Sequence, residues 1–198
     1  ISELPAAGAL TPADLLVVVQ GGASTNAPLA GVWGQVAIDG GQVAGSPAVG
    51  ALASGTAMGA YSQVWAAKAG GFAHGYATDG GTVTSNGYGS VAFGNAQAGG
   101  GIAALGRGTF ASGYTTGAYS AIRASGNGSS AEGYAKAGGQ VVAAGPGSSA
   151  TGYAQGTGSY VTVVGAGSFA SGYATNGGIV EASSGGFAHG YTDGAGSK

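Results

Sequence analysis

One short motif recurs from residue 50 to the end of the chain. The hexapeptide Gly-Phe-Ala-His-Gly-Tyr occurs twice without change, at residues 71–76 and 186–191. Alignment on it gives eight copies of a looser pattern, whose starts are 20, 19, 19, 20, 19, 20 and 18 residues apart. The copies begin at Gly50, Gly70, Gly89, Gly108, Gly128, Gly147, Gly167 and Gly185. Repeats of about 20 residues are typical of solenoids, in which each repeat forms one coil and packs on its neighbours.

Each copy contains an invariant alanine, then a variable residue, then an invariant glycine. Alternation of a fixed small residue with a variable one has the period of a β-strand, so we expect the alanine inside and the variable residue in solvent. The glycine indicates a position where a side chain would clash or where φ must be positive. The predicted core of the repeats consists of Ala73, Ala111, Ala131, Ala150, Ala170, Ala188, Gly75, Gly113, Gly133, Gly152, Gly172 and Gly190.

A second, looser half follows each copy and reads as a turn, a short β-rich run and a glycine. We therefore predict an all-β fold, a glycine-rich β-solenoid or β-roll with about 19–20 residues per coil. A helix is disfavoured, because each glycine inside a helix costs about 1 kcal/mol. Tyrosine follows the glycine in six of the eight copies, and we expect it to stack on its equivalent one coil away. The solenoid domain is predicted to span residues 50–198.

Residues 1–49 do not share the repeat and are predicted to form a separate N-terminal module. Thr11–Asp14 has the residues of a brief helix start. Leu15–Gln20 reads as a buried strand, and Pro28–Val36 as its hairpin partner. We interpret the module as a docking or trimer-nucleating segment that precedes the rod. Its predicted docking residues are Leu15, Leu16, Val17 and Trp33.

The composition excludes several classes of function. Only 6% of the residues are charged, but 44% are hydrophobic, which favours an ordered chain over a disordered one. Five Lys and Arg residues in 198 cannot neutralise a run of phosphates, so no nucleic-acid partner is expected. The chain has no cysteine, which rules out disulfides and thiolate metal sites. The longest aliphatic run, Leu15–Val19, is too short to span a bilayer, so no membrane insertion is expected.

The residues that could carry chemistry are scattered along the repeats. The two histidines, His74 and His189, would lie six coils apart, or about 29 Å at the spacing of β-strands. In the predicted solenoid Asp79 and Asp193 share a turn position, but they too lie six coils apart. A polysaccharide-cleaving enzyme needs two carboxylates within roughly 5–10 Å. We therefore expect a structural protein rather than an enzyme, with no catalytic residue, cofactor or metal. The tyrosines could bind sugars if exposed, although a structural stack is the favoured interpretation.

The opening stretch, ISELPAAGALTPADLLVVVQGG…APLAGV, carries a resemblance. It resembles the N-terminal segment of phage tail-fibre and related virion fibre proteins, which begin with I-S-x-L-P, then L-T-x-x-D and an aliphatic run ending in V-Q. The resemblance implies a trimeric fibre in the virion, docked through its N-terminus to tail, baseplate or capsid proteins. A host surface receptor would bind a distal part of the fibre. The start at Ile1 and the Gly-Ala-Gly-Ser-Lys end indicate a fragment of a longer chain.

The repeats carry a second, looser resemblance. Ser168-Phe169-Ala170-Ser171-Gly172 resembles the S-x-A-x-G core in the head repeats of trimeric autotransporter adhesins, although the period here is longer. Similar repeats also occur in phage fibre shafts. Both resemblances imply a homotrimer. The principal hypothesis is a structural phage fibre that serves adsorption to the host. The alternatives are the head of a bacterial trimeric surface adhesin and a tailspike polysaccharide depolymerase.

Overall fold

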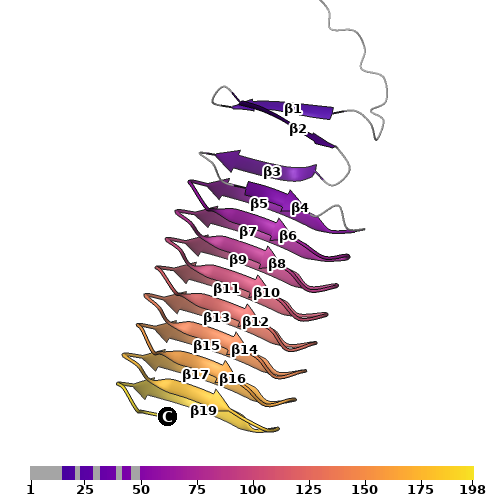
Figure 1. The fold of residues 1–198 in the computed structure, drawn as a ribbon. Coiled ribbons are helices and arrows are strands. Elements are labelled where there is room, and N and C mark those ends of the chain that lie inside the picture. Colours follow the sequence, from indigo (N-terminus) through magenta and orange to yellow (C-terminus); the bar gives the residue numbers. More distant parts are fainter. Residues whose placement is uncertain (1–14, 21–22, 29–31, 39–41, 46–49) are drawn as a thin grey trace, which may run out of the picture.

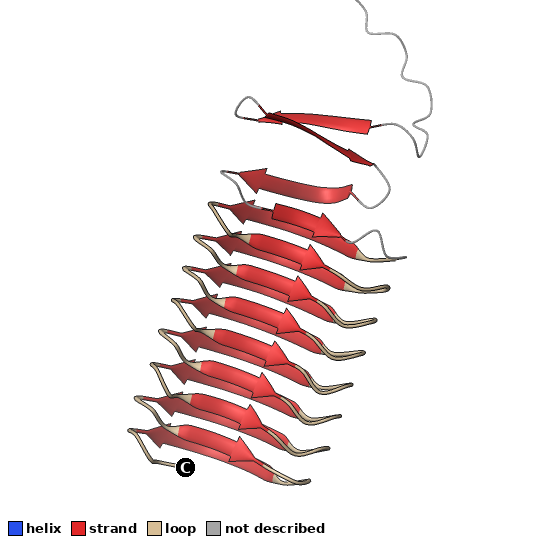
Figure 2. Cartoon of the chain, in the orientation of Figure 1, coloured by secondary structure: helices blue, strands red, loops and turns tan. Residues whose placement is uncertain are grey.

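Two parallel β-sheets run the length of the molecule and form a solenoid (Figure 1). The computed structural model describes residues 15–20, 23–28, 32–38, 42–45 and 50–198. Strands joined by short loops account for this part of the chain, and none of it is helical (Figure 2). Accordingly, none of the described residues belong to a helix long and apolar enough to cross a membrane. The predicted all-β solenoid is confirmed.

Long and short strands alternate along the chain, and each kind forms its own sheet. The order of the nine-stranded sheet is β19-β17-β15-β13-β11-β9-β7-β5-β3, and that of the eight-stranded sheet is β18-β16-β14-β12-β10-β8-β6-β4. The long strands are β3 (Val32–Ile38), β5 (Leu52–Met58), β7 (Phe72–Thr78), β9 (Val91–Gln97), β11 (Phe110–Thr116), β13 (Ser130–Lys136), β15 (Ser149–Gln155), β17 (Phe169–Thr175) and β19 (Phe187–Asp193). The short strands are β4 (Gln42–Gly45), β6 (Gln63–Ala66), β8 (Thr82–Ser85), β10 (Gly101–Ala104), β12 (Ala121–Ala124), β14 (Gln140–Ala143), β16 (Tyr160–Val163) and β18 (Ile179–Ala182).

The eight predicted copies correspond to eight coils, which we number 1 to 8 from the coil of β5 to that of β19. Their long strands pair in parallel with equal letters opposite each other. Ala53 pairs with Ala73, and Gly55 with Gly75. The same register continues to Ala170 and Ala188. We call the residues at one register position in successive coils a column.

Turn length explains why the repeat varies between 18 and 20 residues. From coil 1 onward, complete coils have long strands of seven residues and short strands of four. The turn after the long strand has three residues in coil 2 (79–81) and four in coil 1 (59–62). In the four-residue turns a serine hydroxyl closes the loop, as when Ser62 Oγ donates to the Met58 carbonyl over 2.5 Å. The 18-residue spacing comes from a shortened second turn, 183–186.

The core between the two sheets consists of small side chains in four columns. The second and sixth positions of the long strands contribute mainly alanine, such as Ala73 and Ala77, and both are fully buried. The second position of the short strands contributes Val or Ile, and the fourth mainly alanine. The larger side chains lie over the glycine column, since a Cβ on Gly94 would be 2.8 Å from Ile102 Cδ1. The invariant alanines from Ala53 to Ala170 are fully buried, and Ala188 in the last coil is partly buried.

The invariant glycine has the close backbone contacts that the repeat predicts. A Cβ on Gly55 would be 1.9 Å from the Gly75 carbonyl oxygen, and the same clash recurs down the column to Gly172. Many of these glycines also have a positive φ, +140° at Gly113 for example, which L-residues rarely adopt. Gly190, in the last coil, has no atom within 4 Å of such a Cβ. The close approach of the next coil therefore accounts for the glycine.

The N-terminal part differs from its prediction. β1 (Leu15–Gln20) pairs antiparallel with β2 (Ala23–Pro28), so the hairpin partner is β2 and the prediction of Pro28–Val36 is wrong. β3 instead pairs in parallel with β5, and β4 with β6. The two long sheets therefore begin upstream of the predicted boundary at residue 50. The predicted helix start at Thr11–Asp14 lies outside the described residues.

Candidate functional site

The outer face of the nine-stranded sheet carries two columns of polar and aromatic side chains. The third and fifth positions of the long strands from β5 to β19 point away from the core, and none of their side chains is buried. The third column contains Ser54, His74, Phe93, Ser112, Glu132, Thr151, Ser171 and His189. The fifth column contains Thr56, Tyr76, Asn95, Tyr114, Tyr134, Tyr153, Tyr173 and Tyr191. The glycine column runs between them.

The two histidines occupy equivalent positions of the solenoid, as the repeat predicts. His74 Nδ1 lies 2.7 Å from Ser54 Oγ, and His189 Nδ1 lies 2.6 Å from Ser171 Oγ. In both cases the serine belongs to the same column, one coil earlier. Six strand spacings, or about 29 Å, separate the two rings. Within the described ranges no three His, Asp or Glu side chains are grouped so that they could hold a metal ion.

The tyrosines from coil 4 to coil 8 form a continuous stack, which we call the tyrosine ladder. Successive ring centroids from Tyr114 to Tyr191 are 5.1, 4.9, 4.3 and 5.3 Å apart, and adjacent rings are within 13° of parallel. Burial raises the pKa of Tyr153, and its neighbours Tyr173 and Tyr134 add to the effect. Because each ring covers the face of the next, the ladder offers a ligand mainly ring edges and hydroxyls. The predicted stacking between coils is confirmed.

The fifth column is interrupted in coils 1 to 3, where Thr56 and Asn95 flank Tyr76. A shallow open groove of about 490 Å³ lies there across β5, β7, β9 and β11. Its floor is the glycine column, and His74, Phe93, Tyr76 and Asn95 line it. Asn95 Oδ1 is buried and has no hydrogen-bond partner among the described residues. Such an unsatisfied acceptor costs about 1–3 kcal/mol.

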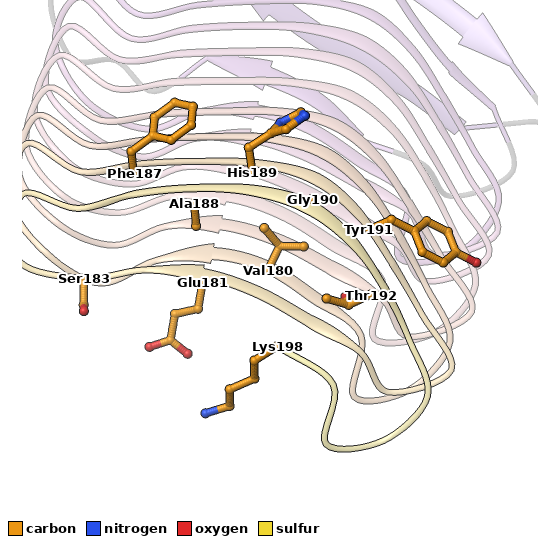
Figure 3. A pocket seen from close by; sticks show the side chains of 10 residues that line it. All are labelled: Val180, Glu181, Ser183, Phe187, Ala188, His189, Gly190, Tyr191, Thr192 and Lys198. Carbon is orange, nitrogen blue, oxygen red and sulfur yellow. The ribbon is translucent and has the colours of Figure 1, made fainter.

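A larger hollow of about 560 Å³ lies at the C-terminal end of the solenoid. Figure 3 shows Val180, Ala188 and Thr192 between β18 and β19, whereas His189 and Tyr191 point away from the hollow. The first three belong to core columns, so the hollow is the uncovered end of the core. Its residues are those that another coil would cover in the middle of the rod.

Asp79 and Asp193 occupy different positions in their coils. Asp79 is the first residue of a turn, with φ 51°, whereas Asp193 ends β19 and pairs with Thr175. The interpretation that they share a turn position is therefore wrong, because Asp193 follows the motif tyrosine by two residues and still belongs to the strand, whereas Asp79 follows it by three. Asp193 accepts hydrogen bonds from Asn176 Nδ2 (2.7 Å) and Thr175 Oγ1 (2.9 Å). These bonds, that of Asn176 first, lower the pKa of Asp193.

The predicted docking residues cannot be built into a site. Leu15, Leu16 and Val17 lie in β1 and Trp33 in β3, but their side chains are outside what the structure describes. The sequence reasoning missed the groove at Asn95. Its signal was the Gly-Asn pair at 94–95, which replaces the usual Gly-Tyr of the repeat.

Comparison with family models, curated proteins and solved structures gives no match.

Proposed function

We propose that this protein is a structural component of a phage fibre. The chain would dock to tail, baseplate or capsid proteins through its N-terminal segment and extend the solenoid as a shaft. A more distal region would bind the host receptor. The N-terminal resemblance supports the fibre assignment, and the solenoid supports the role of a shaft.

The observation that carries this proposal is the unbroken register of eight coils. Backbone hydrogen bonds join the coils at the turns as well as in the sheets: Gly108 N donates to the Tyr88 carbonyl (2.9 Å), and Gly128 N to that of Arg107 (2.8 Å). The aromatic stacks add contacts in the same direction. Each coil is thus fixed to the next along the whole rod, which suits an element that transmits force without a catalytic centre.

The proposed fibre is a homotrimer. A solenoid with a core of mainly Ala and Val buries little apolar surface in each coil, and several aromatic rings stay in contact with solvent. Packing of several chains together would bury part of that surface and stabilise the rod.

Two measurements test the proposal. Sedimentation equilibrium should give three times the chain mass of 18.3 kDa, and antibodies against the solenoid should label an appendage of intact virions in electron micrographs. A monomer at micromolar concentration would overturn the trimer, and virions without label would overturn the fibre assignment. Release of reducing ends from host polysaccharide by the purified protein would indicate a depolymerase instead.

A further inference from the structure

We propose that the groove at Asn95 is a binding site for a neutral oligosaccharide. The inference rests on the groove itself and not on the fibre assignment. It requires only that the outer face of β5, β7, β9 and β11 stays open in the assembled protein. In a trimer the subunits would then meet through the short-strand sheet or the turns (Figure 1).

The groove exists because the tyrosine ladder is interrupted there. A tyrosine at position 95 would complete the column between Tyr76 and Tyr114, as it does in six of the eight coils. Both of these tyrosines also direct their hydroxyls away from the glycine column. Tyr76 OH contacts Met58 Sδ at 3.3 Å, and Tyr114 OH donates to Gln97 Oε1 at 2.9 Å. The glycine floor between the third and fifth columns therefore stays uncovered.

An amide and an imidazole beside this floor can form hydrogen bonds with sugar hydroxyls. Asn95 Oδ1 lacks a donor and is closed to water in this conformation, so the amide must turn about its last side-chain bond to accept a hydrogen bond from a sugar hydroxyl. His74 uses Nδ1 for the Ser54 hydroxyl, and its Nε2 has no protein partner in the described part of the chain. An amide and an imidazole on the two sides of the groove can each bind one hydroxyl of the same sugar ring.

Aromatic rings provide the apolar side of the site. Phe93 is 49% exposed and Tyr76 37% exposed, although both lie in a well-packed sheet. The ring of Tyr76 has no tyrosine above or below it, in contrast to the rings of the ladder. Pyranose rings combine an apolar C–H face with hydroxyls at their rim, and they fit a groove with aromatic walls and a few polar groups.

The lining of the groove contains no charged side chain, which favours neutral ligands over charged ones. The groove is lined by Gly, Thr, His, Tyr, Phe and Asn, without Lys, Arg, Asp or Glu. A phosphate or a sulfated sugar would find no cation there to compensate its charge. A neutral hexose oligomer is the class of ligand that uses all of the groups present.

Saturation-transfer difference NMR on the purified chain tests the site with maltohexaose, cellohexaose, mannohexaose and N-acetylchitohexaose. We expect at least one of them to bind with a dissociation constant below about 10 mM. Asn95→Tyr should fill the groove and abolish the signal. This variant should fold, because tyrosine is the usual residue of the column.

Two further variants separate the role of the amide from general effects. Asn95→Leu keeps a side chain of similar size but removes the hydrogen bond, and it should weaken binding about tenfold. Asn86→Leu, the matched control, changes an exposed asparagine in a turn and should leave binding unchanged. Circular dichroism confirms folding of each variant. Absence of binding to all four sugars, or equal binding by the wild-type chain and Asn95→Tyr, would overturn the proposal. Neither result would affect the sedimentation test of the fibre.

Discussion

The two copies of Gly-Phe-Ala-His-Gly-Tyr have the same six letters but different surroundings. In coil 2 a further coil covers the motif: Ala73 is fully buried, and a Cβ on Gly75 would be 2.0 Å from the Gly94 carbonyl oxygen. Coil 8 is the last of the described coils, and Phe187 and Tyr191 are 73% and 66% exposed. The histidine contact to serine is the same in both copies.

The comparison distinguishes properties set by the repeat sequence, such as strand register, from burial, which depends on the neighbouring coils. The register on the preceding coil is equal in the two copies, although Tyr191 stacks on Tyr173 whereas Tyr76 lies beside Thr56. Burial differs, because it depends on the coil that follows. Equivalent substitutions in the two copies therefore measure the contribution of one coil–coil interface.

The largest expected effect comes from the glycine column. Gly75→Ala should lower the free energy of unfolding by about 3 kcal/mol or more, because the new methyl group would meet the backbone of Gly94. Gly190→Ala should change it by less than about 0.5 kcal/mol, since nothing lies within 4 Å. Neither glycine has a left-handed φ, so the pair isolates packing from backbone strain. Urea unfolding followed by circular dichroism measures both, and equal effects would contradict coil stacking.

A smaller effect is expected from overpacking of the alanine column. Ala73→Val adds two methyl groups to a fully buried position and should destabilise the protein by about 1–3 kcal/mol. Ala188→Val, at the partly buried end of the same column, should have an effect within about 0.5 kcal/mol. The difference in thermal midpoint between the two variants is the measurement. A larger loss for Ala188→Val would show that the last coil is covered in solution.

The regular coils could be predicted from the sequence because the spacing of the repeat gives the register of the parallel strands. Where Ala73 and Gly75 recur at a fixed spacing, the same letters must occupy the same places. The pairing of β3 was mispredicted because this strand lacks the Ala-x-Gly pattern and pairs with β5 through a register shift between Val32 and Gln35. The groove was missed for a different reason. Asn95 is a single departure from the repeat. Whether it opens a groove depends on the side chains of the neighbouring columns, which the sequence alone does not place.

Two threonines in the core, Thr115 and Thr192, have hydroxyls without a hydrogen-bond partner among the described residues. Thr115 and Thr192 stand in the sixth column, where alanine is usual, and the Oγ1 of each is buried without a partner among the described residues. Thr115→Val should raise the free energy of unfolding by about 1 kcal/mol, because it removes an unpaired polar group without changing the shape. Thr192→Val should gain less, as water reaches the last coil more easily.

A matched control for these threonines is Thr109→Val. Thr109 Oγ1 donates to the Gly106 carbonyl over 2.9 Å, so this substitution breaks a real hydrogen bond in an equally buried position. It should destabilise the protein by about 1 kcal/mol. Differential scanning calorimetry distinguishes the opposite signs, and a destabilised Thr115→Val would mean that its hydroxyl has a partner in solution.

The smallest effect concerns the carboxylate of the last copy. The folded pKa of Asp193 is lowered by its hydrogen bonds to Asn176 and Thr175. The carboxylate therefore stabilises the folded state above its usual pKa of about 3.9, and this contribution is lost as the pH falls through the lower folded value. Asp193→Asn should flatten the dependence of the unfolding midpoint on pH below about 4. Asn176→Gly removes the main donor, keeps a residue suited to the positive φ of 50°, and should flatten it in the same way. An unchanged slope in both variants would show that the end of coil 8 is not held by this contact.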